Sequence, residues 1–503
     1  MTMKGFQRSF RPLEILSEGQ VEAIHKGTLQ VLWETGVAFH DKKALQILAD
    51  HGCKVDFDTE RVRFPEWLLE ECIAKCPSTF RVRARDAKKD IILSSGGATY
   101  FGSSSGYRTV DLDTWEPRSP TRKEFYDFIK VLDALPNVHT ITAFPYFGFE
   151  KVPQCMCLLE SNAAKIRNSS KTQMEGSIED NNIWNIRMAK AAGMDLLSLV
   201  NPAAPLSYYD NTTACIYRYT EEEMPFHLAS GPVMGATAPA TIAGGVITPN
   251  VESIAGVVLA QLLKPGTRVW LGNYANMQNM RTGSPAFGAI GNSLHELVFN
   301  QMARKYGIPT WSSSCAWTSS KEIDFQSGYE QAIGAILSAL AGASCVIFQC
   351  GFTHQLVTHP VKAILDDDVA GMAGRLLQGV EVSDETLAVD IINKVGPIPG
   401  MFLKEAHTRK WWKNEQFIPR VADGLPYPEW VKAGKKKIID HGKERMEEIL
   451  SSHEPTPLSS AQEQALEDIL KEARQYYRKK GMISDEEWNL YQKDLSSPNY
   501  PFA

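Results

Sequence analysis

The stretch "YEQAIGAILSALAG" at residues 329–342, followed by "CVIFQCG" at residues 345–351, shows the repeating unit of this chain. The first part has the length and composition of a helix, and the second is a short run of β-branched and aromatic residues that predicts a strand. The same alternation of a short strand and a longer helix recurs from about residue 97 onward. This pattern is typical of parallel βα units.

Eight such strands can be counted. They begin with "ATYFG" at 98, "HTITAFPYF" at 139, "KTQMEG" at 171, "APLSYY" at 204, "FHLASGPV" at 226, "RVWLGNYA" at 268, "PTWSSSCA" at 309 and "CVIFQCG" at 345. Eight repeats of strand and helix predict an α/β fold, a closed (β/α)8 TIM barrel that spans residues 97–380.

A doubly wound open sheet is the rival architecture. It would more often carry a phosphate-binding glycine fingerprint after its first strand. The glycine-rich segment "GPVMGATAPATIAGG" at 231–245 has neither the GxGxxG spacing nor the lysine of GxxxxGK[ST], so we interpret it as a loop and a small-residue helix.

Both ends of the chain are helical in pattern. Residues 1–96 form a predicted N-terminal helical extension, in which "LSEGQVEAIHKGTLQVLWETG" ends at Gly36, a residue that adopts a left-handed helix cap at little cost. Residues 381–503 carry intermixed charges suited to solvent-facing helices and form a predicted C-terminal helical extension.

Composition excludes several classes of protein. The 503 residues carry a formal charge of -6, which does not fit the basic footprint of a nucleic-acid binder. The N-terminus lacks the apolar core of a secretory signal, and no apolar run is judged long enough to span a bilayer. We therefore expect a cytoplasmic protein that does not associate with a membrane. The nine cysteines do not suggest a disulfide framework, and their close pairs have no zinc-binding partner motif, so no metal site is predicted.

Aromatic residues dominate the carboxyl ends of the predicted strands. In a βα barrel these ends meet at one mouth, where reactive groups lie. Aromatic faces attract a cation by about 0.5–2 kcal/mol per ring and suit an ammonium group that cannot donate hydrogen bonds. The alternative is that the rings only close the barrel. We therefore predict a site for a quaternary amine whose aromatic residues are Tyr100, Phe101, Tyr146, Tyr209, Tyr274, Trp311 and Phe352.

Four polar residues complete the predicted substrate site: Glu175, Asn273, Gln349 and His354. Glu175 is either a buried acid near a cation or the partner in a structural hydrogen bond. No HExxH motif occurs, and no catalytic side chain is predicted. This scarcity of acid and base groups suits a reaction in which a tertiary amine leaves a quaternary ammonium as a neutral molecule, because the enzyme then mainly positions its substrate.

Three further segments carry a family resemblance. They are "ETGVAFHDKKALQILADHGCKVDFDTERVRFPEWLLEECIAKCP" at 34–77, "DFQSGYEQAIGAILSALAGASCVIFQCG" at 324–351 with "AILDDDVAGM" at 363–372, and "EAHTRKWWKNEQFIPRVADGLPYPEW" at 405–430. Together they resemble the trimethylamine methyltransferase (MttB-like) superfamily over nearly the whole chain.

The resemblance implies a barrel whose mouth docks a separate corrinoid protein, with the Co(I) corrinoid of that partner as methyl acceptor and no cofactor held tightly by the chain itself. It also implies a homo-oligomer. Archaeal members that use trimethylamine carry pyrrolysine, for which the corresponding point here lies near Phe348 to Phe352, but this chain contains only the ordinary twenty residues. The resemblance therefore places the chain in the branch without pyrrolysine, whose substrates are already quaternary.

Glycine betaine, giving dimethylglycine, is the first expected substrate. Proline betaine, carnitine and γ-butyrobetaine are alternatives, and their shared carboxylate needs hydrogen-bond donors such as Asn273, Gln349, His354 and the backbone amides near Gly351. Two other readings stay open: a zinc-dependent methanol- or thiol-type methyltransferase, which the scattered cysteines disfavour, and a module that binds quaternary amines without catalysis.

Overall fold

A computed structural model describes residues 5–142, 151–176, 180–498 and 500. Its centre is a closed barrel of eight parallel strands, which confirms the predicted (β/α)8 fold. In barrel order the strands are β6 (Tyr100–Ser103), β9 (Thr140–Thr142), β10 (Thr172–Glu175), β11 (Leu196–Val200), β13 (Phe226–Ser230), β15 (Val269–Asn273), β17 (Thr310–Ser312) and β18 (Cys345–Gln349).

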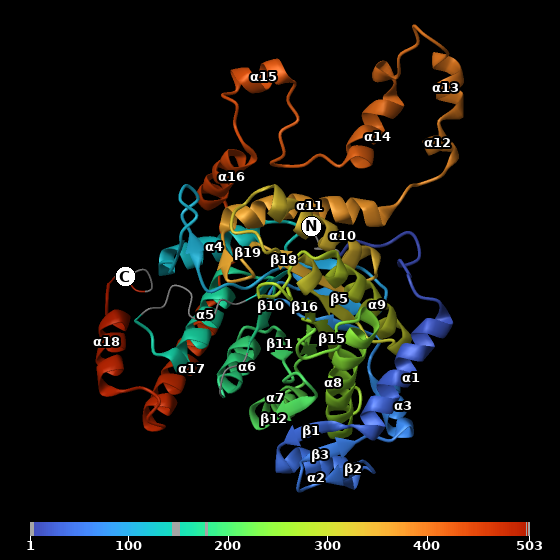
Figure 1. Cartoon of the computed structure of the whole chain (residues 1–503). Helices are drawn as coiled ribbons and strands as arrows, with labels where there is room; N and C mark the ends of the chain where they lie inside the picture. Colours follow the sequence, from blue (N-terminus) through green and yellow to red (C-terminus); the bar gives the residue numbers. More distant parts are fainter. Residues whose placement is uncertain (1–4, 143–150, 177–179, 499, 501–503) are drawn as a thin grey trace.

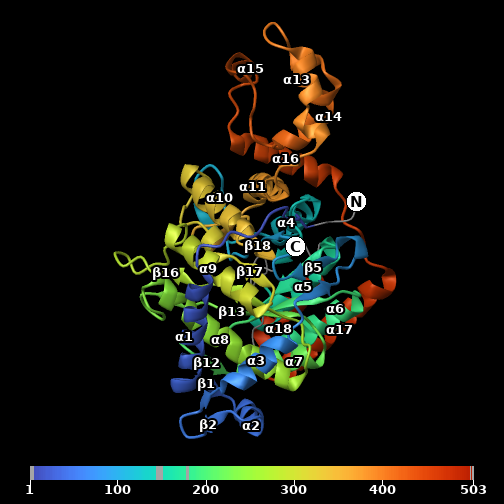
Figure 2. The ribbon, with the colours of Figure 1, turned by 90° about the vertical axis from the view of Figure 1, so that its right-hand side faces the viewer.

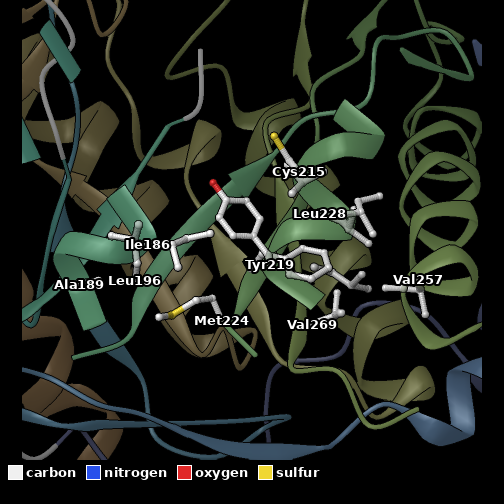
Figure 3. Packing of buried hydrophobic residues seen from close by; sticks show 14 of the residues in the cluster. Ile186, Ala189, Leu196, Cys215, Tyr219, Met224, Leu228, Val257 and Val269 are labelled. Carbon is white, nitrogen blue, oxygen red and sulfur yellow. The ribbon is translucent and has the colours of Figure 1, made fainter. Parts of the chain in front are cut away.

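Eight helices surround these strands (Figure 1). They are α4 (Arg122–Ala134), α5 (Gln154–Asn168), α6 (Asn182–Ala191), α7 (Asp210–Glu221), α8 (Ile242–Leu263), α9 (Ile290–Tyr306), α10 (Phe325–Leu340) and α11 (Pro360–Gln378). The main apolar core fills the layer between strands and helices. Figure 3 shows part of it, where Tyr219 of α7 lies among Leu196, Met224, Leu228 and Val269.

The fourth strand was predicted in the wrong place. The barrel uses "LLSLV" at Leu196–Val200, whereas the predicted strand at 204–209 forms β12 (Ser207–Tyr209) outside the barrel. There β12 pairs in parallel with β1 (Val37–His40) of the N-terminal extension, and Tyr208 stacks on Phe39 with 4.8 Å between ring centroids. The position of β12 is determined by pairing with β1, which lies about 170 residues earlier in the sequence. A local sequence pattern cannot reveal such a distant partner.

The N-terminal extension closes the barrel at its amino-terminal end. It contains α1 (Glu18–Glu34), α2 (Lys42–Asp50), α3 (Glu66–Lys75), β1 with β2 (Lys54–Asp56) and β3 (Arg61–Arg63), and the hairpin of β4 (Thr79–Val82) and β5 (Ile91–Ser94). Val82 and Leu93 of this hairpin belong to the same apolar cluster as Tyr100 and Trp270 inside the barrel. The hairpin therefore forms the barrel floor.

Helix α8 has a composition that needs explanation. By length and composition alone it is long and apolar enough to cross a membrane, yet 83% of its most apolar window is buried in the fold. It packs against α1, α3, α7 and α9. Its apolar surface is thus used in core packing.

Three pairs of short strands lie in the loops at the barrel mouth. They are β7 (Thr109–Val110) with β8 (Pro117–Arg118), β14 (Val233–Met234) with β16 (Asn276–Met277), and β19 (Gly351–Phe352) with β20 (Val357–Thr358). The loops around β14 and β16 project from the left-hand side of Figure 2.

The C-terminal extension divides into a projecting part and a packed part. Helices α12 (Asp384–Leu387), α13 (Val389–Val395), α14 (Ala406–Gln416) and α15 (Tyr427–Lys432) stand away from the barrel, at the top of both views (Figures 1 and 2). Helices α16 (Ile438–Ser452), α17 (Ser460–Lys479) and α18 (Asp485–Leu495) return to it. Helix α17 is fixed by a buried ion pair of 2.9 Å between Arg474 and Glu160 of α5.

Glycine permits a close contact beneath the mouth. A Cβ atom on Gly334 of α10 would lie 1.9 Å from the carbonyl oxygen of Cys315, in the short turn Ser314–Ala316 that follows β17. Helix α10 can therefore pack this closely against the turn only because residue 334 has no side chain. The turn leads directly to Trp317, so the contact helps to fix the position of that ring.

We expect Gly334→Ala to destabilise the protein by about 1–3 kcal/mol, because the added methyl group meets backbone that cannot move freely. Gly328→Ala on the same helix is the matched control: its Cβ would meet nothing within 4 Å, and the change should stabilise by about 0.5–1 kcal/mol. Thermal unfolding midpoints of the two variants measure the difference. Equal midpoints would show that the contact at Gly334 has no structural role.

Candidate functional site

Side chains alternate between the inside and the outside of the barrel along each strand. Strand register identifies the inner set: Met174 lies beside Leu197, His227 beside Trp270, and Trp311 beside Cys345. Apart from His227, which contacts the rings of Trp270 and Trp311, these side chains share one apolar cluster. The neighbouring positions on each strand face the surrounding helices.

Aromatic rings form a continuous series inside the barrel. The ring of His227 lies 5.4 Å from Trp270 and 4.9 Å from Trp311, measured between centroids. Trp311 in turn lies 4.6 Å from Tyr274 in an edge-to-face arrangement. Tyr274 is only partly buried, so the series reaches from the interior toward the mouth.

The series continues through the loops above the strands. Tyr274 lies 5.6 Å from Trp317, Trp317 lies 5.2 Å from Phe287, and Phe287 lies 6.0 Å from His354. The indole of Trp317 donates a hydrogen bond of 3.1 Å to the carbonyl of Ile347 on β18. We call the whole series the aromatic column; its members are Trp270, His227, Trp311, Tyr274, Trp317, Phe287 and His354.

Buried polar atoms beside the aromatic column lack partners. Among the described residues, neither amide atom of Gln349, neither ring nitrogen of His227 and neither indole nitrogen of Trp270 and Trp311 has a hydrogen-bond partner of good geometry. Burial lowers the pKa of His227 to about 3, against a weaker opposing effect of the Ser198 backbone, so its imidazole is neutral. Such groups are available to a ligand or to water.

The loop after β18 has an unusual backbone. Cys350, Thr353, His354 and Gln355 all have positive φ angles, between 51° and 77°. Residues other than glycine rarely adopt this conformation, and such strain concentrates at functional sites. The amides of Thr353 and His354 donate to the carbonyls of Ser320 and Thr318, at 2.8 and 3.1 Å. The loop that carries His354 is therefore held against the loop that carries Trp317.

Glu175 and Asn273 face outward at the ends of their strands. Glu175 forms a fully buried ion pair of 3.1 Å with Lys165 of α5, and burial raises its pKa to about 7. Asn273 donates to Glu296 of α9 at 2.8 Å. Burial also raises the pKa of Glu296 to about 7, although hydrogen bonds from Ser312, Asn273 and Asn300 oppose the shift. Both predicted residues thus belong to a polar layer behind the strands.

Other predicted residues lie away from the mouth, which corrects their expected position. The hydroxyl of Tyr100 accepts a hydrogen bond of 3.1 Å from Ile92 in the barrel floor. Phe101 faces outward and packs against Phe6 and Phe348. Tyr209 lies on β12, where it is 51% exposed and stacks on His40.

Phe352 of β19 is buried in a cluster with Val357 of β20 and Val110 of β7. Tyr146 lies outside the described residues. Of the predicted set, the structure brings Tyr274, Trp311 and His354 together in one series of ring contacts, and Gln349 ends β18, the strand to which Trp317 is bonded.

The predicted set omits four rings that extend the series: His227, Trp270, Trp317 and Phe287. His227 and Trp270 occupy the interior positions of strands that were correctly predicted, so alternation along those strands could have identified them. Phe287 lies in a loop, and no sequence signal places it at the mouth.

Ser104 is not among the predicted site residues, although "GSSSG" at 102–106 matches the GxSxG pattern of serine nucleophiles. Its hydroxyl donates to the side-chain oxygen of Gln355, and no hydrogen bond between Ser104 and a histidine is found among the described residues. Nor do three His, Cys, Asp or Glu side chains in the described part of the chain gather in a group that could hold a metal ion.

Known proteins resemble this chain over most of its length. The family described as "Trimethylamine methyltransferase (MTTB)" matches residues 1–477. A glycine betaine methyltransferase from Desulfitobacterium hafniense (strain Y51) is 29% identical over 455 residues, 88% of this chain and 94% of the relative. A trimethylamine methyltransferase MttB from Desulfitobacterium hafniense (strain DSM 10664 / DCB-2) is 28% identical over 477 residues, 92% of this chain and 94% of the relative.

Among solved structures, the monomethylamine methyltransferase of Methanosarcina barkeri superposes with a TM-score of 0.53 at 13% identity, covering 92% of this chain and 88% of that one. This likeness supports the fold. The family match extends over nearly the whole sequence, from the N-terminal extension through the barrel and into α17. The chain therefore belongs to the trimethylamine methyltransferase (MTTB) family of methyltransferases.

Proposed function

We propose that this protein transfers a methyl group from a small quaternary amine to the Co(I) corrinoid of a partner corrinoid protein. The aromatic column is the observation that carries this proposal. Its rings Trp311, Tyr274 and Trp317 adjoin one another from the barrel interior to the mouth. A trimethylammonium group has no hydrogen-bond donor, so aromatic faces are the surface that binds it best.

The electrostatics inside the barrel favour such a guest. His227, the titratable member in the interior, is neutral, because burial lowers its pKa to about 3. The ammonium group of the substrate is therefore not repelled by a positive charge on this imidazole. Glu175 and Glu296 lie behind the strands, so their protonation does not create an acid that points at the substrate.

Glycine betaine is the proposed substrate, and dimethylglycine the product. A relative named as a glycine betaine methyltransferase supports this choice. The carboxylate of betaine needs donors, and the amide of Gln349 and the imidazole of His354 are the groups we assign to it. Proline betaine, carnitine and γ-butyrobetaine share the same head group and carboxylate and are the alternative substrates.

The chain's own contribution to the reaction is positioning. The corrinoid of the partner supplies the nucleophile that accepts the methyl group. Trp311, Tyr274 and Trp317 orient the ammonium head so that one methyl group faces the mouth, and Gln349 and His354 fix the other end. The amine leaves as a neutral molecule, so no side chain has to donate a proton.

The rim of the mouth suits a transient protein partner. Phe325 at the start of α10, Leu356 between β19 and β20, and Met280 after β16 are all exposed, Phe325 to 85%. Exposed apolar patches are typical of protein docking surfaces. We assign this rim to the corrinoid protein.

A methylation assay tests the proposed function. Purified protein is mixed with Co(I) cobalamin and a panel of tertiary and quaternary amines, and corrinoid methylation is followed by its visible spectrum. We expect methylation with glycine betaine and none with trimethylamine, because this chain lacks the pyrrolysine that activates a tertiary amine. Faster methylation with trimethylamine would overturn the assignment. Calorimetric binding of betaine without methylation, in the presence of the cognate corrinoid protein, would instead identify a binding module.

Replacement of one ring tests the aromatic column. We expect Tyr274→Leu to lower kcat/KM for betaine by about 3- to 30-fold, since one ring contributes about 0.5–2 kcal/mol to binding a cation. Tyr274→Phe keeps the ring and should retain most of the activity. Tyr209→Leu removes an exposed ring outside the barrel and serves as the matched control. An equal loss in the Leu and Phe variants would show that the hydroxyl, and not the ring, matters.

A further inference from the structure

The carboxyl group of Glu330 is buried against the loops that carry the outer members of the aromatic column. Glu330 lies in the second turn of α10 and is 7% exposed. Its Oε2 atom accepts hydrogen bonds from the hydroxyl of Thr318 at 2.5 Å and from the amide of Ser319 at 2.9 Å. These two residues directly follow Trp317 in the sequence. The carboxyl group therefore fixes the backbone next to the Trp317 ring.

The same carboxyl group contacts the loop that carries Phe287. Gly288 has a φ angle of 79°, and a Cβ atom there would lie 2.3 Å from the carboxyl carbon of Glu330. The glycine backbone and the carboxyl group thus pack together with no space for a side chain. Ser319 joins this loop to the previous one, because its hydroxyl donates to the carbonyl of Phe287 at 2.9 Å.

The loop that carries His354 is attached to the same group of bonds. The amide of His354 donates to the carbonyl of Thr318 at 3.1 Å. The hydroxyl of Thr318, which donates to Glu330, also accepts from the amide of Ser320 at 3.0 Å. Trp317, Phe287 and His354 therefore lie on three separate loops whose contacts converge on one carboxyl group.

Helix α10 holds this carboxyl group in a fixed place. Asp324, which caps the helix, accepts from the hydroxyl of Ser320 at 2.8 Å. Gln331, the residue after Glu330, donates to the carbonyl of Gly351 on β19 at 3.0 Å. The helix is thus joined both to the loop after β17 and to the hairpin after β18. A buried amide or hydroxyl that loses its acceptor is costly, so the loops keep this arrangement only while position 330 supplies an acceptor.

We propose that Glu330 is a positioning residue, which sets the rings of Trp317 and Phe287 and the imidazole of His354 in the arrangement that binds a quaternary amine. The inference rests on the proposed function, because that function assigns the aromatic column to the substrate. Both carboxyl oxygens are engaged by the protein, since Oε1 accepts from the side-chain amide of Gln326 at 2.9 Å. Glu330 therefore acts through the three loops and not by contact with the substrate.

Calorimetric binding of quaternary amines to Glu330 variants tests the proposal. Purified protein is titrated with glycine betaine, or with the alternative betaines where it does not bind, in the absence of a corrinoid protein. Glu330→Met keeps the length of the side chain but removes its acceptors, so we expect the Kd to rise about 5- to 100-fold. Glu330→Gln keeps an acceptor for Thr318 and Ser319, and Gln326 can turn its own amide oxygen toward the new NH₂ group. Its Kd should therefore stay within about threefold of the wild-type value.

Glu322→Met is the matched control, because it makes the same change at an exposed position before α10 and should bind like the wild type. A Glu330→Met protein that unfolds at a lower temperature but binds like the wild type would overturn the proposal, since it would leave only a structural role. Equal weakening in the Met and Gln variants would also overturn it. If Glu330→Met does not fold, Thr318→Val removes the hydroxyl between Glu330 and Ser320 instead, and an unchanged Kd in that variant contradicts the proposal.

Hydrogen exchange without a ligand separates this proposal from the proposed function. A wild type that binds none of the betaines would reject the proposed function. The amides of Ser319, Ser320, Thr353 and His354 should nevertheless exchange faster in Glu330→Met than in Glu330→Gln, because their loops lose the acceptor that holds them. Equal exchange in the two variants would show that Glu330 does not position these loops.

Discussion

Alternation of side chains along closed parallel strands is the constraint on which the site depends. In the closed barrel, every second side chain of each strand points inward, and residues that pair on neighbouring strands point to the same side of the sheet. Trp270 and His227 are therefore adjacent and inward, as are Gly272 and Trp311. Glycine at 272 matters here, because a Cβ atom would lie 2.8 Å from the ring of His227. The barrel interior has room for large rings at some inward positions because other inward positions, such as Gly272, contribute almost no side chain.

The same constraint separates what could be predicted from what could not. Local pattern located most of the strands, because a β-branched run followed by an amphipathic helix is a local property. It failed at Ser207–Tyr209, whose partner strand β1 lies in the N-terminal extension. Which residues near the strand ends point into the barrel depends on how neighbouring strands are aligned. Asn273 and Tyr274 are consecutive, yet Asn273 donates a hydrogen bond to Glu296 behind the strand and Tyr274 contacts Trp311 inside the barrel. Sequence predicted both as lining residues, because it did not fix which of the two points inward.

The outward polar residues explain why carboxyl groups are buried behind the strands that carry the aromatic column. Glu296 accepts from Asn273 at the end of β15, and Ser312 of β17 also donates to it. In the same way Glu252 of α8 accepts from the amide of Leu206 at 2.8 Å and from Ser230 of β13. These carboxyl groups connect strand ends to the helices behind them, which holds the rings on the opposite faces of those strands in place. Their raised pKa values reflect burial that the fold tolerates because each is hydrogen-bonded.

Positioning by the scaffold, and not by reactive side chains, is consistent with the chemistry of a quaternary amine. A cation that cannot donate hydrogen bonds gains little from a carboxylate that must first be desolvated, whereas aromatic faces cost almost nothing to desolvate. Removing one methyl group turns this cation into a neutral amine, which the same rings bind less strongly. In the proposed reaction, the aromatic column binds the quaternary substrate more strongly than the neutral amine product, because the charge that attracts the rings is lost when the methyl group leaves.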